Sequence, residues 1–207
     1  MTDYKASKII NGTSAERTGN IDYSQLQDDG TKSICANTYY GGKLNSSIFH
    51  GKTISSVTFY AYNGSSAWTG TLTCTLADEV GNSIGVIGTG SYTIGTSETE
   101  LTFNTTARTL PSGKKGFVML TVSGACDSGN NNIKAMESST PTNDDIIWCA
   151  GNAFNSLTEY SSVFPMIKVN YNGGTGANNA QTYSIFSETD TGKDFLFGSD
   201  GNWTEVA

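Results

Sequence analysis

Histidine, proline and charged side chains are scarce in this 207-residue chain. It has one histidine and three prolines, and charged residues make up 15% of it, where roughly 25% is typical. His50, in a loop-like setting, is therefore the only imidazole for a metal site or a Ser-His-Asp triad. A Gly-x-Ser-x-Gly elbow and a complete phosphate-binding loop are also missing. We expect no catalytic residue, no cofactor and no metal ligand.

Positive charge is also in short supply. The chain has 12 Lys and Arg against 19 Asp and Glu, a formal net charge of −7, whereas a groove that follows a nucleic-acid backbone is basic. No apolar run approaches the roughly 18 residues of a membrane-spanning helix, and residues 1–5 lack the apolar stretch of a signal peptide. We expect no nucleic-acid partner, no membrane insertion and synthesis in a cytosol.

The cysteines show no sign of metal or redox chemistry. No Cys-x-x-Cys motif occurs among Cys35, Cys74, Cys126 and Cys149. We expect all four to be small buried hydrophobic residues. Cys74 supports this expectation, because it shares one strand face with Leu72 and Leu76 while the intervening threonines share the other.

Apolar residues alternate with polar ones along most of the chain, and no stretch keeps an apolar stripe at helical spacing for three turns. The 24 glycines lie mostly in turns between such segments. We expect strands over residues 54–62, 70–77, 83–89, 99–104, 116–122, 132–136, 146–149 and 166–171. The pattern predicts an all-β fold, an antiparallel β-sandwich of the jelly-roll type.

The sandwich is expected to carry two flanking parts. Residues 1–33 are polar and are predicted to be an edge strand or an arm that orders on a partner, and residues 34–172 form the sandwich. Residues 173–180, rich in Gly and Asn, suit a flexible linker. Residues 181–207 are a C-terminal β-meander or hairpin module, and three short strands are marginal alone. We expect this module to dock on the main domain, a second copy or another protein.

The C-terminal module carries the most specific motif in the chain. Residues 186–193 are Phe-Ser-Glu-Thr-Asp-Thr-Gly-Lys, and residues 200–203 are Asp-Gly-Asn-Trp. Asp190, Gly192 and Gly201 suit tight turns, and Trp203 supplies a large apolar body. The segment, about 20 of 207 residues, resembles an E-T-D-T-G-K … D-G-x-W segment found in many virion proteins of tailed bacteriophages. Any small β-meander could use the same turns and tryptophan, which is the alternative explanation.

The resemblance implies a virion structural protein of the head-fibre or tail-fibre type. Such a protein is assembled in the host cytoplasm, has capsid or tail proteins as partners, and is commonly a homotrimer. The motif residues would then belong to a docking module, and the sandwich would face outward.

Three aromatic residues are candidates for a contact surface. Tyr60, Tyr62 and Trp68 are expected on, or just beyond, the non-core face of one strand. Flat aromatic rings beside Asn63 and Ser65 would suit the apolar face and hydroxyls of a host-surface glycan. Burial against another sheet, a subunit or the terminal module is the favoured interpretation of these three residues, because large exposed aromatic patches are usually covered, and glycan contact is the alternative.

Acidic clusters offer two further possibilities. A glycosidase needs two carboxylates at a set separation, and adjacent acids occur at 28–29, 78–79 and 144–145. All three pairs lie in turn-like stretches, so we interpret them as solvated turn residues. Residues 127–132 offer oxygen ligands for calcium, with Asp127 the first place to look, but they fail the EF-hand spacing.

The favoured prediction is a bacteriophage virion appendage protein that attaches to the particle and contacts a host-surface glycan, without catalysis. A free carbohydrate-binding module or lectin-like domain is the alternative. A glycan hydrolase that uses the acids above is a third possibility.

Overall fold

The computed structural model describes residues 9–12, 20–26, 30–34, 38–64, 66–123, 133–138, 144–172, 185–197 and 203–206. Within these ranges the chain forms β-strands and two short 3-10 helices, η1 (Ser47–Phe49) and η2 (Phe154–Ser156), and no α-helix. The prediction of an all-β fold is confirmed.

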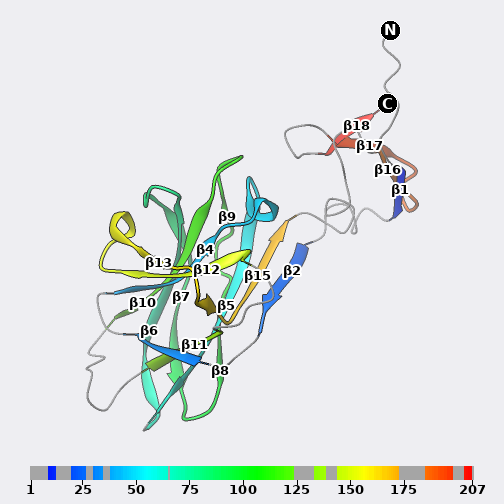
Figure 1. Ribbon diagram of the computed structural model, residues 1–207. Coiled ribbons are helices and arrows are strands. Elements are labelled where there is room, and N and C mark those ends of the chain that lie inside the picture. The colour runs from blue at the N-terminus through cyan, green and yellow to red at the C-terminus, as the bar shows by residue number, and fades with distance from the viewer. Residues whose placement is uncertain are drawn as a thin grey trace. The chain divides into compact units, whose positions relative to one another are not determined.

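Two large sheets make up the sandwich (Figure 1). The six-stranded sheet has the order β13 (Thr158–Tyr160), β12 (Ile146–Gly151), β4 (Tyr39–Leu44), β10 (Gly116–Ser123), β6 (Trp68–Asp78) and β7 (Ser83–Ile94). The eight-stranded sheet runs β14 (Phe164–Pro165), β11 (Ile133–Ser138), β5 (Thr53–Asn63), β15 (Ile167–Asn172) and β2 (Asn20–Gln25). In this second sheet β3 (Gly30–Ile34) pairs with β11, while β8 (Thr99–Phe103) and β9 (Arg108–Thr109) pair with β5.

The fold is an antiparallel β-sandwich, as the alternation of apolar and polar residues predicts. All strand pairs of known register within the two large sheets are antiparallel. Sequence analysis located most of the long strands to within a few residues but did not anticipate β4, β9, β13 or β14. The jelly-roll connectivity stays a prediction.

The core lies between the two sheets and is formed by every second side chain of each strand. In β6 the side chains of Leu72, Cys74 and Leu76 are fully buried. On the opposite face Thr71 is exposed and Thr73 half-buried, whereas Thr75, beside the covered outer patch of β10, is only 7% exposed. This confirms the expected face of that strand. Burying one Leu-sized side chain contributes about 1.5–3 kcal/mol, so these regular inward rows are the main stabilising feature of the sandwich.

Strand β10 is buried on both of its faces. Val118 and Leu120 lie on one face, and Phe117 and Met119 lie on the other, each at most 5% exposed. The second face packs with Ala77 and Cys149, and Phe154 of η2 packs against this cluster together with Tyr39 and Leu157. The segment around η2 therefore covers an apolar patch on the outside of the six-stranded sheet.

A glycine permits the close approach of β4 and β10. A Cβ atom on Gly41 would lie 2.0 Å from the carbonyl oxygen of Val118 and 3.0 Å from the Cα of Met119. Both are backbone atoms of the neighbouring strand, so no side-chain rotation could relieve the clash.

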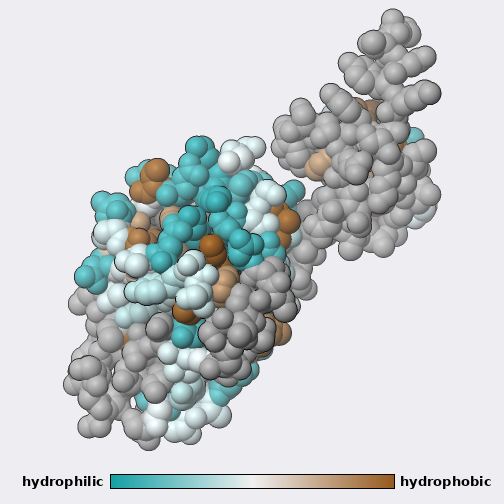
Figure 2. All heavy atoms as spheres, viewed as in Figure 1, coloured by the Kyte–Doolittle hydropathy of each residue, from teal (hydrophilic) through white to brown (hydrophobic). Residues whose placement is uncertain are grey.

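The outer face of β6 and β7 is polar and uncharged. Hydroxyl pairs bridge the two strands at Thr69 and Thr93 (2.9 Å) and at Thr73 and Thr89 (3.0 Å). Figure 2 shows mostly hydrophilic and neutral residues on the visible face of the sandwich, with hydrophobic ones in separate spots. On these two strands, threonine hydroxyls occupy outer positions where charged side chains are common in other proteins, in keeping with the low share of charged residues in the sequence.

The chain divides into two compact units, residues 22–170 and residues 1–21 with 171–207. The expected boundaries lay at 33/34 and near 172, so the structure differs in the first part of the chain. Strands β2 and β3 pair within the large sheet, whereas β1 (Ile9–Gly12) pairs in parallel with β16 (Ile185–Glu188). Residues 1–33 are therefore divided between both units, because strand pairing over a long sequence separation leaves no local signal. The linker at 173–180 lies outside the described residues.

Gly41→Ala should destabilise the sandwich by about 2 kcal/mol or more, because the added methyl group overpacks against the backbone of β10. Urea unfolding monitored by circular dichroism measures the change. Gly95→Ala is the matched control, since the nearest atom to its Cβ, the Ser97 nitrogen, lies at 4.0 Å. Equal stability of the two variants would contradict the close approach of β4 and β10.

Candidate functional site

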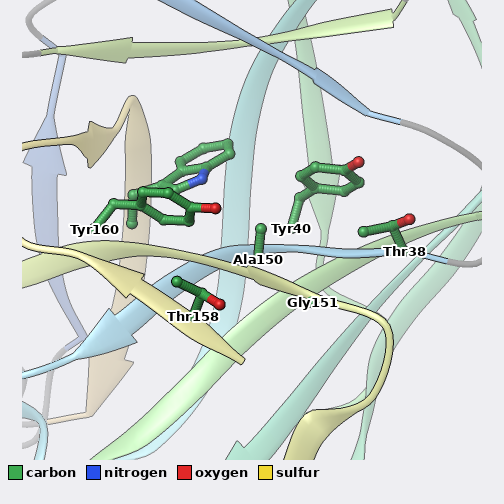
Figure 3. A pocket seen from close by; sticks show the side chains of 7 residues that line it. Thr38, Tyr40, Ala150, Gly151, Thr158 and Tyr160 are labelled. Atoms are coloured by element: carbon green, nitrogen blue, oxygen red, sulfur yellow. The ribbon is translucent and has the colours of Figure 1, made fainter. Parts of the chain in front are cut away.

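An aromatic cleft lies on one face of the six-stranded sheet, at its β13 edge. It has a volume of about 340 Å³ and is lined by Thr38, Tyr40, Trp148, Ala150, Gly151, Thr158 and Tyr160. The register explains the hollow: Trp148 pairs with Tyr160, while Ala150 pairs with Thr158 on one side and Tyr40 on the other. Figure 3 shows Ala150 between the rings of Tyr160 and Tyr40. A methyl-sized side chain between larger neighbours makes the floor of the cleft.

The aromatic residues of the cleft differ in exposure. Trp148 is 1% exposed and Tyr160 is 39% exposed, while Tyr40 is half-buried, with its ring centroid 6.4 Å from that of Trp148. The tryptophan is thus anchored in the core, and the tyrosines present ring surface to the hollow.

Among the described residues that line the cleft there is no Asp, Glu, Lys, Arg or His. Glu159, between two lining residues in sequence, points to the opposite face of the sheet, where its carboxylate lies 2.6 Å from Lys43 Nζ. The cleft therefore offers aromatic surface and hydroxyl groups without a charged group, a setting suited to binding a neutral molecule.

Tyr60 and Tyr62 share a face of β5, as expected, but Tyr60 is only 3% exposed and packs with Met166 and Tyr62. Its hydroxyl donates to Glu100 Oε1 (2.9 Å), and Lys168 Nζ lies 5.2 Å from its ring centroid. Burial raises the pKa of the Tyr60 hydroxyl, whereas Lys168 and the Tyr60 hydroxyl lower the pKa of Glu100. In the folded chain, Tyr60 therefore packs against its neighbours, and its ring is not accessible to a ligand.

Trp68 is not beside these tyrosines. It begins β6 of the other sheet, and the period of two places it on the same face as Leu72 and Cys74. The side chain is 7% exposed, and its ring lies over Gly70, whose Cβ would be 2.2 Å from Trp68 Cζ2. The three predicted residues do not form one aromatic surface. β5 ends at Asn63 and β6 begins at Trp68 in the other sheet, which separates them.

The acid pairs that the structure describes stabilise turns and surface contacts. Asp78 accepts hydrogen bonds from the backbone of Val80 and from the backbone and side chain of Asn82, which lower its pKa. Glu79 lies 2.7 Å from Lys114 Nζ, and this contact lowers the pKa of Glu79. Asp28, Asp29 and Asp127 lie outside the described residues.

The third acid pair closes a turn through its backbone. The carbonyl oxygen of Asp145 accepts from the backbone nitrogens of Asn45 (2.8 Å) and Ser46 (3.1 Å), and that of Asp144 accepts from Asn45 Nδ2 (3.1 Å). These contacts hold the start of β12 beside the end of β4.

His50 follows η1 directly. Its Nε2 atom is buried and makes no hydrogen bond within the described part of the chain. Burial lowers the pKa of His50, and the charge of Lys115 acts in the same direction. The described residues contain no group of three or more His, Cys, Asp and Glu placed to hold a metal ion. Among the same residues, no helix has the length and apolarity to cross a membrane.

Cys74 and Cys149 are free and buried, as expected, whereas Cys35 and Cys126 lie outside the described residues. Burial raises the pKa of both described thiols, that of Cys149 to about 12. They are therefore protonated at neutral pH, and a protonated thiol is a poor nucleophile.

The C-terminal motif forms a separate small sheet with the order β1, β16, β17 (Asp194–Phe197) and β18 (Trp203–Val206). Pairing of Phe186 with Phe195 and of Phe197 with Trp203 places aromatic side chains together. The Trp203 ring centroid lies 5.6 Å from that of Phe186 and 4.9 Å from that of Phe197. Its Nε1 atom is buried and has no hydrogen-bond partner among the described residues.

The E-T-D-T-G-K residues build the turn between β16 and β17. Glu188, only 4% exposed, accepts a short hydrogen bond from the Thr191 hydroxyl. The Gly192 nitrogen donates to the Glu188 carbonyl oxygen (3.0 Å), and Gly192 has a positive φ of 71°, which favours glycine. Asp190 is exposed in this turn, and Gly201 lies outside the described residues.

Comparison with known proteins shows no family model that matches this chain and no similar curated protein.

Sequence reasoning missed the cleft because its residues come from distant segments. The Tyr39–Tyr40 pair next to two glycines was a signal for a strand with one aromatic ring on each face. Tyr160 follows in a short edge strand, and nothing in its local sequence indicates that it pairs with Trp148.

Glu188→Ala should weaken the small sheet by about 1–3 kcal/mol, because the turn loses the hydrogen bond between the buried Glu188 carboxylate and the Thr191 hydroxyl. Hydrogen exchange of the β16 and β17 amides measures this change. Glu205→Ala is the control, since the Glu205 ion pair with Lys193 (3.0 Å) is half-exposed and such pairs contribute about 0–1 kcal/mol. Equal exchange in both variants would count against the role assigned to Glu188.

Cys149 should resist iodoacetamide at pH 8 in the folded protein, because its raised pKa leaves almost no thiolate. The same residue should be alkylated in concentrated urea, where its pKa returns to about 8.5. Mass spectrometry of the peptide that contains Cys149 checks both states, and rapid labelling of the native chain would be the opposite outcome.

Proposed function

We propose that this chain is a structural protein of a bacteriophage particle, an appendage of the head-fibre or tail-fibre type. In this proposal the small sheet attaches the chain to capsid or tail proteins, and the sandwich contacts a host-surface glycan without catalysis. The resemblance of residues 186–203 to a segment of tailed-phage virion proteins motivates the class.

One observation carries the proposal. The motif lies in a sheet of its own that takes β1 from the far end of the sequence, and this sheet belongs to a compact unit distinct from the sandwich. The motif residues stabilise that sheet. Glu188 and Thr191 form a hydrogen bond across its turn, and Trp203 packs on Phe186. A separate sheet of four short strands suits a module that a partner completes, because β1 and β18 are its edge strands and edge strands offer backbone groups for pairing with another chain.

The surface chemistry agrees with assembly in a particle. The outer strand faces carry paired threonine hydroxyls in place of charges. Exposed large hydrophobic residues, such as Val80 and Val86, are scattered rather than gathered. A neutral polar face of this kind can lie beside copies of itself without like-charge repulsion, as in the homotrimer that the resemblance implies.

A free carbohydrate-binding module is the second candidate function. The aromatic, uncharged cleft around Tyr40 and Tyr160 favours it, because the cleft lies entirely within the sandwich unit. On this alternative the chain would be monomeric and would work without a particle.

Density-gradient fractionation of a lysate from cells that produce the particles tests the proposal. Peptides of this chain should occur in the particle fraction, and the purified chain should have about three times the 21.9 kDa mass of one copy by light scattering. The Glu188→Ala variant should be depleted from particles, whereas Glu205→Ala should remain. A monomer found only in the soluble fraction would reject the virion proposal and favour the free module.

A further inference from the structure

We propose that the cleft between Tyr40 and Tyr160 binds one ring of a neutral saccharide, with the tyrosine rings against its apolar face and threonine hydroxyls at its rim. This inference deepens the proposed function, since it names the site and ligand class of the glycan contact. It also holds for a free binding module, and the experiment below separates the two.

The dimensions of the cleft suit a single ring. Its volume of about 340 Å³ lies at the lower end of the range for small-molecule sites, about 300–1,000 Å³. The floor is Ala150, with Tyr40 and Thr158 paired on either side of it. Tyr160 stands at the open edge, 39% exposed. A flat ring can therefore enter from the edge strand and lie between the two tyrosines.

The chemistry of the lining selects the ligand class. A pyranose has a face of C–H groups and a rim of hydroxyls, so it needs aromatic surface and hydrogen-bonding groups side by side. The cleft supplies the first from Tyr40 and Tyr160, and the second from Thr38 and Thr158, whose hydroxyls can each donate and accept. An alkyl ligand would leave these hydroxyls without bound partners, which is unfavourable.

The uncharged character of the described lining favours a neutral sugar over an anionic one. None of the described lining residues is a Lys or Arg that could pair with a carboxylate or sulfate. The nearest charged side chains in sequence, Lys43 and Glu159, bind each other on the opposite face of the sheet. A uronic or sialic acid would have to desolvate its carboxylate without compensation.

Two other hollows of the sandwich lack this combination. The described residues that line one of them, of about 340 Å³, are Ser24, Ser56, Thr58, Lys168 and Asn170, without an aromatic ring. The other, of about 370 Å³, has Tyr39 as the one aromatic residue among its described lining residues, and that ring is already packed on Phe154 at 4.2 Å between centroids.

The test uses the full chain and a defined set of oligosaccharides. The probes are hexamers of glucose in α- and β-linkage, of mannose, of galactose and of N-acetylglucosamine, with sialyllactose and oligogalacturonate as anionic comparators. Binding is screened on an array, and the strongest neutral probe is then titrated by calorimetry. We expect binding of at least one neutral probe and none of the anionic ones.

Variants locate the site. Tyr160→Ala should weaken binding about tenfold, the loss expected for one aromatic stacking contact, whereas Tyr160→Phe should retain most of it. Ala150→Leu should also abolish binding, because it fills the floor and leaves every aromatic ring in place. Tyr92→Ala, on β7 at the opposite edge of the same sheet, is the matched control and should bind like the wild type. Circular dichroism confirms that each variant is folded.

Three results would overturn the inference: no binding of any neutral probe at millimolar concentration, a preference for the anionic probes, or binding that survives both Tyr160→Ala and Ala150→Leu. Particle fractionation of Tyr160→Ala separates this inference from the proposed function. This variant should still enter particles. Absence of the wild-type chain from particles would reject the virion proposal but leave sugar binding unaffected.

Discussion

The burial of β10 on both faces is the constraint on which the rest of the six-stranded sheet depends. Its run Phe117–Leu120 places apolar side chains alternately into the core and onto the outer side of the sheet. The outer pair has to be covered, and η2 supplies that cover. The neighbouring strand must also come close, and Gly41 permits the approach because it has no Cβ to meet Val118. β4 in turn pairs with β12, so the packing of one central strand sets where the cleft-forming strands lie.

The cleft is a consequence of this arrangement at the edge of the sheet. β13 is short and exposed along its length. The side chains at the pairing of β13 with β12 are therefore only partly covered. Trp148 is held in the core, and Tyr160, which is 39% exposed, pairs with it from the edge strand. An edge strand thus turns part of a buried aromatic cluster into an accessible surface, and small Ala150 leaves the space between the rings open.

The small sheet is stabilised by different interactions. Its aromatic residues are few, and its turn depends on Glu188, Thr191 and Gly192 rather than on a large core. The parallel pairing of β1 with β16 brings together residues more than 170 positions apart. Both facts suit a module whose stability comes from precise turns and from completion by other strands, the property on which the proposed attachment role rests.

Much of the fold could be predicted from sequence, because a period of two and glycine-rich turns are local signals. The face of Leu72, Cys74 and Leu76, and the shared face of Tyr60 and Tyr62, belong to this class. The sequence alone determined the all-β class, most of the long strands and the turn motif at 188–192. Only the tertiary structure decided that Trp68 belongs to another sheet than Tyr60, that β1 joins the C-terminal strands, and that Tyr40, Trp148 and Tyr160 meet. The reason is physical: alternation specifies which side of a strand a residue occupies, but only pairing between distant strands decides what lies beside it.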